Sequence, residues 1–194
     1  MKIVGITGGI GSGKSTVCRI FQILNIPIYD ADSHAKALIH EDTVKQQIIT
    51  TFGTEAYLND QLNRDYMAQQ VFSDGNKVEQ LNSIVHPALA KHFKQWVKEQ
   101  SSPYVIKEAA ILIESGSHQA CDVVVNVSAP ITLRIQRIKT RDTFRSETEI
   151  QGIIDKQLSD EERNQIADFT LTNDEKSLLI PQVLKLHQAI LEKE

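Results

Sequence analysis

The feature that most constrains this chain is a glycine-rich loop near its N-terminus, Gly8-Gly9-Ile10-Gly11-Ser12-Gly13-Lys14-Ser15. The loop follows a short β-branched run, Lys2 to Thr7, which has the composition of a buried strand. After the loop, apolar residues recur with the spacing of one helix face. Because glycines let consecutive N–H groups turn inward at the positive end of the following helix, this arrangement predicts a binding site for the phosphates of a nucleoside triphosphate.

The loop has the spacing G-x-x-x-x-G-K-S, and each residue type in it suits a separate task. We expect the Lys14 side chain to reach the β- and γ-phosphates and to take part in catalysis. The Ser15 hydroxyl is suited to bind the Mg²⁺ that bridges the same phosphates. Contacts with ATP are predicted for Gly11, Ser12, Gly13, Lys14, Ser15 and Thr16. The alternative is a flexible glycine turn with a chance lysine.

The order of the expected elements is that of an α/β protein with a doubly wound, five-stranded parallel sheet. The strands are expected over residues 2–7, 26–29, 103–109, 121–127 and 169–172. We predict one domain, residues 1–194, with its core in residues 1–30, 101–140 and 166–194. A helical insertion over residues 31–100, without strands, is expected to hold the acceptor of the phosphoryl group, and residues 141–165 to form a lid. Pro87 should kink or restart a long helix over residues 76–99.

Composition narrows the possible partners and the location of the protein. The net charge of −4 and the pI near 5.9 argue against a surface devoted to nucleic acid or to an anionic membrane. No apolar run approaches the roughly 18 residues that span a bilayer, and the N-terminus lacks a signal-peptide pattern. The two cysteines, Cys18 and Cys121, lie in apolar segments and suit reduced core thiols. We therefore expect a cytoplasmic protein that works as a monomer on small molecules.

Two carboxylates follow the second expected strand, at Asp30 and Asp32. The carboxyl ends of strands line the ligand crevice of an open α/β sheet, so both side chains are candidates for the site. One would hold Mg²⁺ or its water shell, and the other would accept a proton from an attacking hydroxyl. We assign Asp32 as the base and Asp30 to the metal, and this division is left open. Alternatively, one of them caps the helix that begins near Ser33.

Arginines are concentrated in the segment that precedes and enters the expected lid. Arg137 and Arg141 are one helical turn apart and share a face, and Arg145 follows. Guanidinium groups on a mobile segment stabilise the charge that spreads over a transferring phosphoryl group, so Arg141 is a catalytic candidate and Arg137 an ATP contact. The alternative is an ordinary solvated basic face.

The chain resembles the dephospho-CoA kinases along nearly its whole length. The resemblance is carried by an ordered set of segments: Thr7 to Thr16, Asp30-Ala31-Asp32, Phe52-Gly53, Leu62-Asn63-Arg64, Leu81-Asn82 with Val85-His86-Pro87, Leu112-Ile113-Glu114, Arg137 to Asp142, Gln157, Ala167-Asp168-Phe169 and Asn173. It departs from the usual pattern at Glu108-Ala109-Ala110, where the family often has aspartate and proline. It also departs at Arg134, where glutamine is common, at Gln61, and after Asn173, where a glycine is often found.

The resemblance implies a P-loop kinase that uses ATP and Mg²⁺ to phosphorylate the ribose 3′-hydroxyl of dephospho-CoA, the last step of coenzyme A biosynthesis. It makes Asp32 the base and places Arg64 near the phosphate groups of the acceptor. Acceptor binding is further implied for Thr7, His86, Leu112 and Glu114, and Asn173 would flank the adenine. His86 alternatively packs before a kinking proline. The rival functions are a nucleoside or nucleotide monophosphate kinase and a nucleotide-binding regulator without activity.

Overall fold

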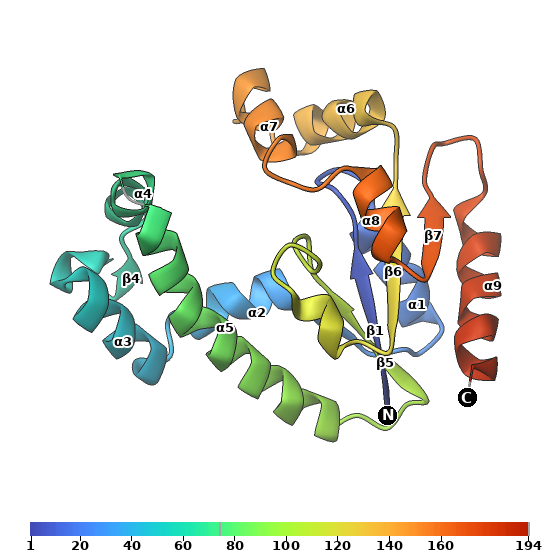
Figure 1. Cartoon of the computed structure of the whole chain (residues 1–194), viewed down its shortest axis with the longest axis horizontal. Coiled ribbons are helices and arrows are strands. Elements are labelled where there is room, and N and C mark those ends of the chain that lie inside the picture. Colours follow the sequence, from blue (N-terminus) through green and yellow to red (C-terminus); the bar gives the residue numbers. More distant parts are fainter. Residues whose placement is uncertain (74, 194) are drawn as a thin grey trace. The chain divides into compact units, whose positions relative to one another are not determined.

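The computed structural model describes residues 1–73 and 75–193, without the side chains of residues 71–75, and divides into two compact units (Figure 1). The first unit consists of Met1–Asp30 and Gln100–Glu194, and the second of Ala31–Glu99. The chain therefore leaves the first unit directly after Asp30 and returns to it at Gln100.

A five-stranded parallel sheet forms the centre of the first unit, in the order β2-β5-β1-β6-β7. The strands are β1 (Lys2–Thr7), β2 (Ile28–Asp30), β5 (Tyr104–Glu108), β6 (Val123–Ser128) and β7 (Phe169–Thr172). Most of their side chains are apolar, β-branched and buried, as expected where helices cover both faces of a parallel sheet. The predicted fold class is confirmed.

Helices cover this sheet on both sides, with α8 in front of it and α1 behind it in Figure 1. The helices of the first unit are α1 (Lys14–Ile23), α6 (Ile131–Arg141), α7 (Glu147–Ile154), α8 (Asp160–Ile166) and α9 (Leu179–Glu192), with a 3₁₀ turn at Ser117–Ala120. Phe21 of α1 and Leu186 of α9 pack into one buried cluster with Val4, Ile106 and Val125 of the strands. Both α7 and α8 begin with a serine–glutamate capping box, which fixes their starting points.

The second unit is mainly helical and has its own core. It contains α2 (Ala31–Leu38), α3 (Asp42–Phe52), a 3₁₀ turn at Thr54–Ala56, α4 (Arg64–Ser73) and α5 (Gly75–Lys98). Val44, Ile48 and Phe52 of α3 meet Met67 of α4, and Leu81 of α5 packs against them. Pro87 lies inside α5, so the long helix does not restart there.

The expectation of a strand-free second unit was wrong. Two short antiparallel strands, β3 (Tyr57–Leu58) and β4 (Gln61–Leu62), form a hairpin. Asn59 and Asp60 make its two-residue turn with φ of 49° and 67°, the left-handed conformation that asparagine and aspartate tolerate best after glycine. Strands of two residues leave no alternating pattern long enough to detect.

The parallel arrangement brings the carboxyl ends of all five strands to one edge of the sheet. Thr7, Asp30, Glu108, Ser128 and Thr172 are the last residues of their strands and therefore lie along that edge. The glycine-rich loop follows Thr7, at the centre of the row, so the phosphate site has strand ends on both sides of it.

Candidate active site

The glycine-rich loop joins β1 to α1 and wraps closely around the N-terminus of that helix. Gly13 is the residue before α1 and has φ of 95°, a left-handed conformation in which a side chain would also be 2.1 Å from the Asn173 amide nitrogen. The Lys14 ammonium donates to the Gly8 carbonyl at 2.9 Å, across the mouth of the loop. Ser12 is fully buried and its N–H donates to the Gly9 carbonyl at 3.0 Å, so its contact with ATP stays a prediction.

A cavity of about 340 Å³ opens over this loop. It is lined by the backbone of the loop and by Lys14, Ser15 and Thr16. The predicted arginines of α6, Arg137 and Arg141, also line it. Arg19 also lines the cavity and was not predicted. It lies four residues after Ser15, on the same face of α1, which is the signal that could have identified it. Three guanidinium groups and one ammonium group around a set of backbone amides make a site for a polyanion.

A carboxylate that the sequence reasoning did not assign lies beside Ser15. The Ser15 hydroxyl donates to Glu108 Oε1 at 3.1 Å, and Glu108 is the register partner of Asp30 on the neighbouring strand. The sequence did contain a signal for Glu108. This residue lies near the end of the next expected strand, at residues 103–109, and so at the same edge of the sheet as Asp30. Burial, and next the negative charge of Glu108, raise the pKa of the Cys18 thiol well above its usual range, so Cys18 stays neutral.

Oxygen ligands of this kind suit Mg²⁺, which prefers carboxylates, hydroxyls, phosphates and water. Ser15, Glu108 and Asp30 supply such oxygens next to the phosphate cavity. Within residues 1–73 and 75–193, no group of three or more His, Cys, Asp or Glu side chains could hold a metal ion alone. The residues present therefore fit an ion that takes its remaining ligands from nucleotide and water.

The two predicted arginines of α6, Arg137 and Arg141, have different partners. Arg137 donates to the backbone carbonyl of Asn173 at 3.2 Å and to Glu175 at 3.3 Å, which ties α6 to the loop after β7. Arg141 makes two N–H···O bonds to Asp142, at 2.8 and 2.9 Å, and its side chain is 63% exposed. Hydrogen bonds from Arg141, and further ones from Arg145, lower the pKa of the Asp142 carboxyl. Arg141 is thus oriented at the cavity while its outer surface remains open.

Asn173 supports the loop from the other side. Its side-chain amide donates to the Ser12 carbonyl at 2.8 Å, and its backbone N–H donates to the Ser128 carbonyl. The end of β7, the end of β6 and the glycine-rich loop are therefore joined through this one residue. A contact between Asn173 and adenine stays a prediction.

Three residues assigned to acceptor binding are held inside the first unit. Thr7 and Leu112 are fully buried, and the Thr7 hydroxyl has no hydrogen-bond partner. Glu114 accepts from the buried Arg163 at 3.0 Å and from the Leu158 N–H at 3.1 Å. These contacts give Leu112 and Glu114 structural tasks, and their roles toward an acceptor stay predictions.

The second unit carries the remaining predicted residues. Asp32 lies exposed in the first turn of α2, and His86 is exposed on α5 rather than packed in the core. Arg64 is the first residue of α4 and lines a cavity of about 220 Å³ together with Lys36 and His40. That combination of basic side chains suits a phosphate-bearing ligand.

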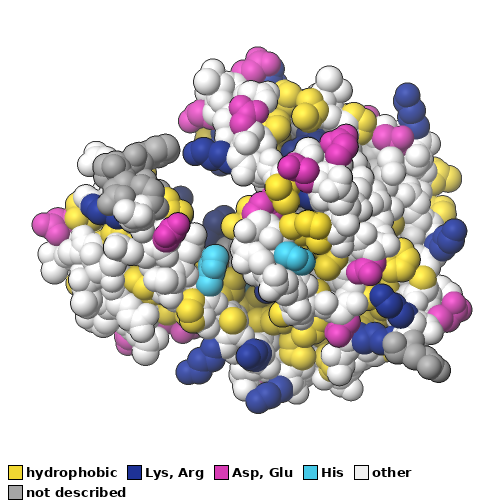
Figure 2. Space-filling view, in the orientation of Figure 1, with side chains coloured by type: hydrophobic (Ala, Val, Ile, Leu, Met, Phe, Trp, Pro, Cys, Tyr) yellow, Lys and Arg dark blue, Asp and Glu magenta, His cyan; other side chains and the backbone are white. Residues whose placement is uncertain are grey.

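Basic and acidic side chains are interspersed on the face that Figure 2 shows. Among the described residues there is no helix with the length and apolar character required to cross a membrane.

A glycine-rich loop after the central strand of a parallel sheet, with a lysine and the arginines of α6 around one cavity, defines a P-loop kinase. The family model described as dephospho-CoA kinase matches residues 2–178. A dephospho-CoA kinase of Porphyromonas gingivalis is 41% identical over 194 residues, which cover 100% of this chain and 96% of that protein. The chain therefore belongs to the dephospho-CoA kinase family.

Solved structures agree with this assignment. TT1252 from Thermus thermophilus superposes with a TM-score of 0.86 and 29% identity, covering 97% of this chain and 96% of that one. A dephospho-CoA kinase from Campylobacter jejuni has a TM-score of 0.69 and 26% identity, covering 99% and 98%.

Proposed function

We propose that this chain transfers the γ-phosphoryl group of ATP to the ribose 3′-hydroxyl of dephospho-CoA, giving CoA and ADP as the last step of coenzyme A biosynthesis. The observation that carries the proposal is the phosphate cavity over the glycine-rich loop, with Lys14 and Arg141 on its wall, in a chain of this family. The enzyme works as a monomer in the cytoplasm, on small molecules rather than on nucleic acid.

The donor is held by the loop and by α6. Backbone N–H groups of the segment from Gly11 to Thr16, other than that of Ser12, which already donates to the Gly9 carbonyl, bind the phosphates at the positive end of α1. Lys14 exchanges its bond to the Gly8 carbonyl for the β- and γ-phosphates. Arg141 stabilises the negative charge that the phosphoryl group carries during transfer. Arg137 and Asn173, already bonded to each other, flank the adenine.

Mg²⁺, when bound, would neutralise part of the negative charge of the phosphates. Ser15 would hold it directly, and Asp30 and Glu108 would orient its water ligands from the two neighbouring strand ends. Because Glu108 accepts the hydrogen bond of the Ser15 hydroxyl, the lone pairs of the serine oxygen would remain available to a cation.

The acceptor is bound through the second unit. Asp32 takes the proton of the 3′-hydroxyl as that oxygen attacks the γ-phosphorus, and its exposed carboxylate is accessible for this role. Arg64, with Lys36 and His40 around the same cavity, binds the phosphate groups of dephospho-CoA, and His86 contributes from α5. Asp30 is the alternative base, in which case Asp32 serves the metal.

The test is to supply the purified protein with ATP, Mg²⁺ and dephospho-CoA and to follow ADP and CoA together. The expected result is equimolar formation of both products and no transfer to a nucleoside monophosphate offered in place of dephospho-CoA. Turnover of the monophosphate, with none of dephospho-CoA, would assign the protein to the rival kinase class. ATP binding without transfer to either acceptor would favour the regulator.

A further inference from the structure

Ile10, the large apolar residue of the glycine-rich loop, is held from two sides by residues outside the loop. Its backbone N–H donates to Gln157 Oε1 at 2.8 Å, and its carbonyl accepts from Arg134 Nε at 2.9 Å. Its side chain packs against Ile138 of α6 and Ile150 of α7. The loop is therefore fixed at Ile10 by α6 and by the segment between α7 and α8.

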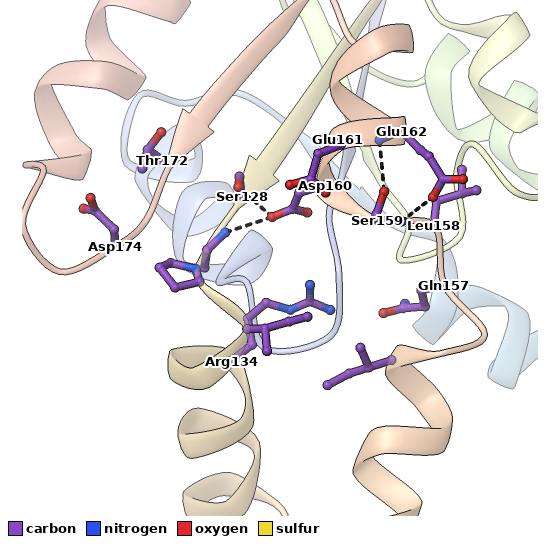
Figure 3. A pocket seen from close by; sticks show the side chains of 14 residues that line it. Ser128, Arg134, Gln157, Leu158, Ser159, Asp160, Glu161, Glu162, Thr172 and Asp174 are labelled. Atoms are coloured by element: carbon purple, nitrogen blue, oxygen red, sulfur yellow. Dashed lines mark hydrogen bonds between the residues drawn. The ribbon is translucent and has the colours of Figure 1, made fainter.

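Gln157 and Arg134 line the cavity drawn in Figure 3, which has a volume of about 590 Å³. Arg134 comes from the first turns of α6 and Gln157 from the segment between α7 and α8, and their polar ends point toward each other in Figure 3. Arg134 is only 3% exposed, so its guanidinium is confined by its neighbours. We call Gln157, Ile10 and Arg134 the Ile10 clamp.

The clamp acts on two successive peptide groups. A peptide is planar and trans, so its N–H and C=O point in opposite directions. In the first peptide the Ile10 N–H points to Gln157, so the Gly9 carbonyl points away from Gln157. On that opposite side the Gly9 carbonyl accepts from the Ser12 N–H at 3.0 Å. When the Ile10 carbonyl points to Arg134, the Gly11 N–H is turned away from Arg134 by the same rule.

Arg134 also explains why a glycine stands at position 9. A Cβ on Gly9 would lie 2.0 Å from Arg134 Nη2 and 2.3 Å from Cζ. Gly9 is not among the residues with positive φ, so the space taken by the guanidinium, and not the backbone angle, excludes a side chain there. An alanine at this position would push Arg134 from the Ile10 carbonyl or shift the loop.

We propose that Gln157 and Arg134 are positioning residues for ATP: by holding the two peptide groups of Ile10, they keep the loop amides oriented for the phosphates before the nucleotide arrives. Preorganised donors bind without the cost of ordering the loop, so loss of either contact weakens nucleotide binding more than it weakens the fold. The inference rests on the proposed ATP site but not on the identity of the acceptor.

The first experiment removes the acceptor atom of Gln157 while keeping its size. Gln157→Met has no oxygen for the Ile10 N–H, whereas Gln157→Glu retains one, and Gln151→Met alters an exposed glutamine of α7 as a matched control. With Mg·ATP in isothermal titration calorimetry, Gln157→Met should raise the Kd about 3–10-fold, and the other two less than about twofold. The KM for ATP should rise with the Kd, while the KM for dephospho-CoA stays within about twofold.

The second experiment is a double-mutant cycle between Gly9→Ala and Arg134→Gln. Each single variant should bind Mg·ATP about 3–10-fold more weakly than the parent. The double variant should bind no more weakly than Gly9→Ala alone, because the glutamine side chain at position 134 is shorter than arginine and makes room for the new methyl group. Gly152→Ala is the control, since a Cβ there meets nothing within 4 Å.

Parent-like Mg·ATP binding in Gln157→Met and Gly9→Ala would overturn the positioning role proposed for the Ile10 clamp and would leave the proposed function intact. So would a fall in the urea midpoint of Gln157→Met with both KM values unchanged, because that is the signature of a purely structural contact. A parent protein that binds no Mg·ATP would overturn both proposals together.

Discussion

Arg163 and Glu114 form a buried ion pair in which Arg163 Nη2 donates to Glu114 Oε1 at 3.0 Å. Arg163 has no exposed surface, and its other close carboxylate is Asp160, at 3.5 Å. Asp160 in turn accepts from the Ser128 hydroxyl and from the Ala129 N–H at the end of β6. The pair thus links the segment after β5, the start of α8 and the end of β6.

Glu114→Ala should therefore act on stability rather than on acceptor binding. It leaves the fully buried guanidinium with Asp160 as its remaining close carboxylate. A buried charge that loses its only partner costs about 3–5 kcal/mol, so this loss should cost a part of that. We expect a clear fall in the urea midpoint of unfolding, measured by circular dichroism, with the KM for dephospho-CoA within about twofold of the parent value. A large rise in that KM without loss of stability would support the role in acceptor binding implied by the family resemblance.

Removal of the proposed base should separate binding from chemistry. Asp32→Asn keeps the size of an exposed side chain, so the fold and the Kd for ATP should not change. A positioned general base contributes about 10²–10⁴-fold, and kcat should fall by at least that factor. Single-turnover transfer to dephospho-CoA is the measurement. Near-normal turnover in Asp32→Asn, with a large loss in Asp30→Asn, would assign the base to Asp30.

The thiols provide a prediction for pH. Burial raises the pKa of Cys121 from 9.0 to about 11, and that of Cys18 further. Because the thiolate is the nucleophile, the native protein at pH 8 should react with iodoacetamide about 100-fold more slowly at Cys121 than the unfolded chain does. The raised pKa means that the fold holds the proton more tightly. The contribution of this proton to the free energy of unfolding is therefore complete below pH 9 and is lost as the pH rises toward 11.

The labelling is followed by mass spectrometry between pH 7 and pH 10, and Cys121→Ala isolates the reaction of Cys18. Labelling of native Cys121 at the rate of the urea-unfolded protein would show that the thiol is not protected. The urea midpoint of Cys121→Ala should depend less on pH above pH 9 than that of the parent.

The central fold was predictable because its signals are local and long enough to detect. Lys2 to Thr7 is an apolar strand followed at once by the glycine motif, and Val123–Ser128 is a nearly continuous run of buried β-branched residues. The β3–β4 hairpin was missed because each strand has only two residues, too few to show a periodic pattern. The turn at Asn59 and Asp60, where both residues have positive φ, is what sets the hairpin.

The site was predictable where a residue type and its spacing carry the chemistry, and not where distant segments meet. Lys14, Ser15, Arg137 and Arg141 do line one cavity. The Ile10 clamp joins residues 10, 134 and 157, and no pattern along the chain reveals that meeting. Arg134 was visible in the sequence as a departure from the family pattern, but its contact with the Ile10 carbonyl depends on how α6 packs against the loop.

Glu108 provides the sharpest test of the proposed magnesium site, because its contact with Ser15 predicts a specific dependence on the metal. Glu108→Gln keeps a hydrogen-bond acceptor for the Ser15 hydroxyl but removes a negative charge beside the cation. The Mg²⁺ concentration for half-maximal activity should therefore rise by about tenfold or more, while kcat at saturating Mg²⁺ falls much less. Activity titrated with Mg²⁺ at fixed ATP measures both quantities. Glu175→Gln, which likewise removes one carboxylate but one that contacts Arg137 instead of Ser15, is the matched control. An unchanged Mg²⁺ requirement in Glu108→Gln, with a raised requirement in Asp30→Asn, would place the cation on the Asp30 side and leave Glu108 only to orient Ser15.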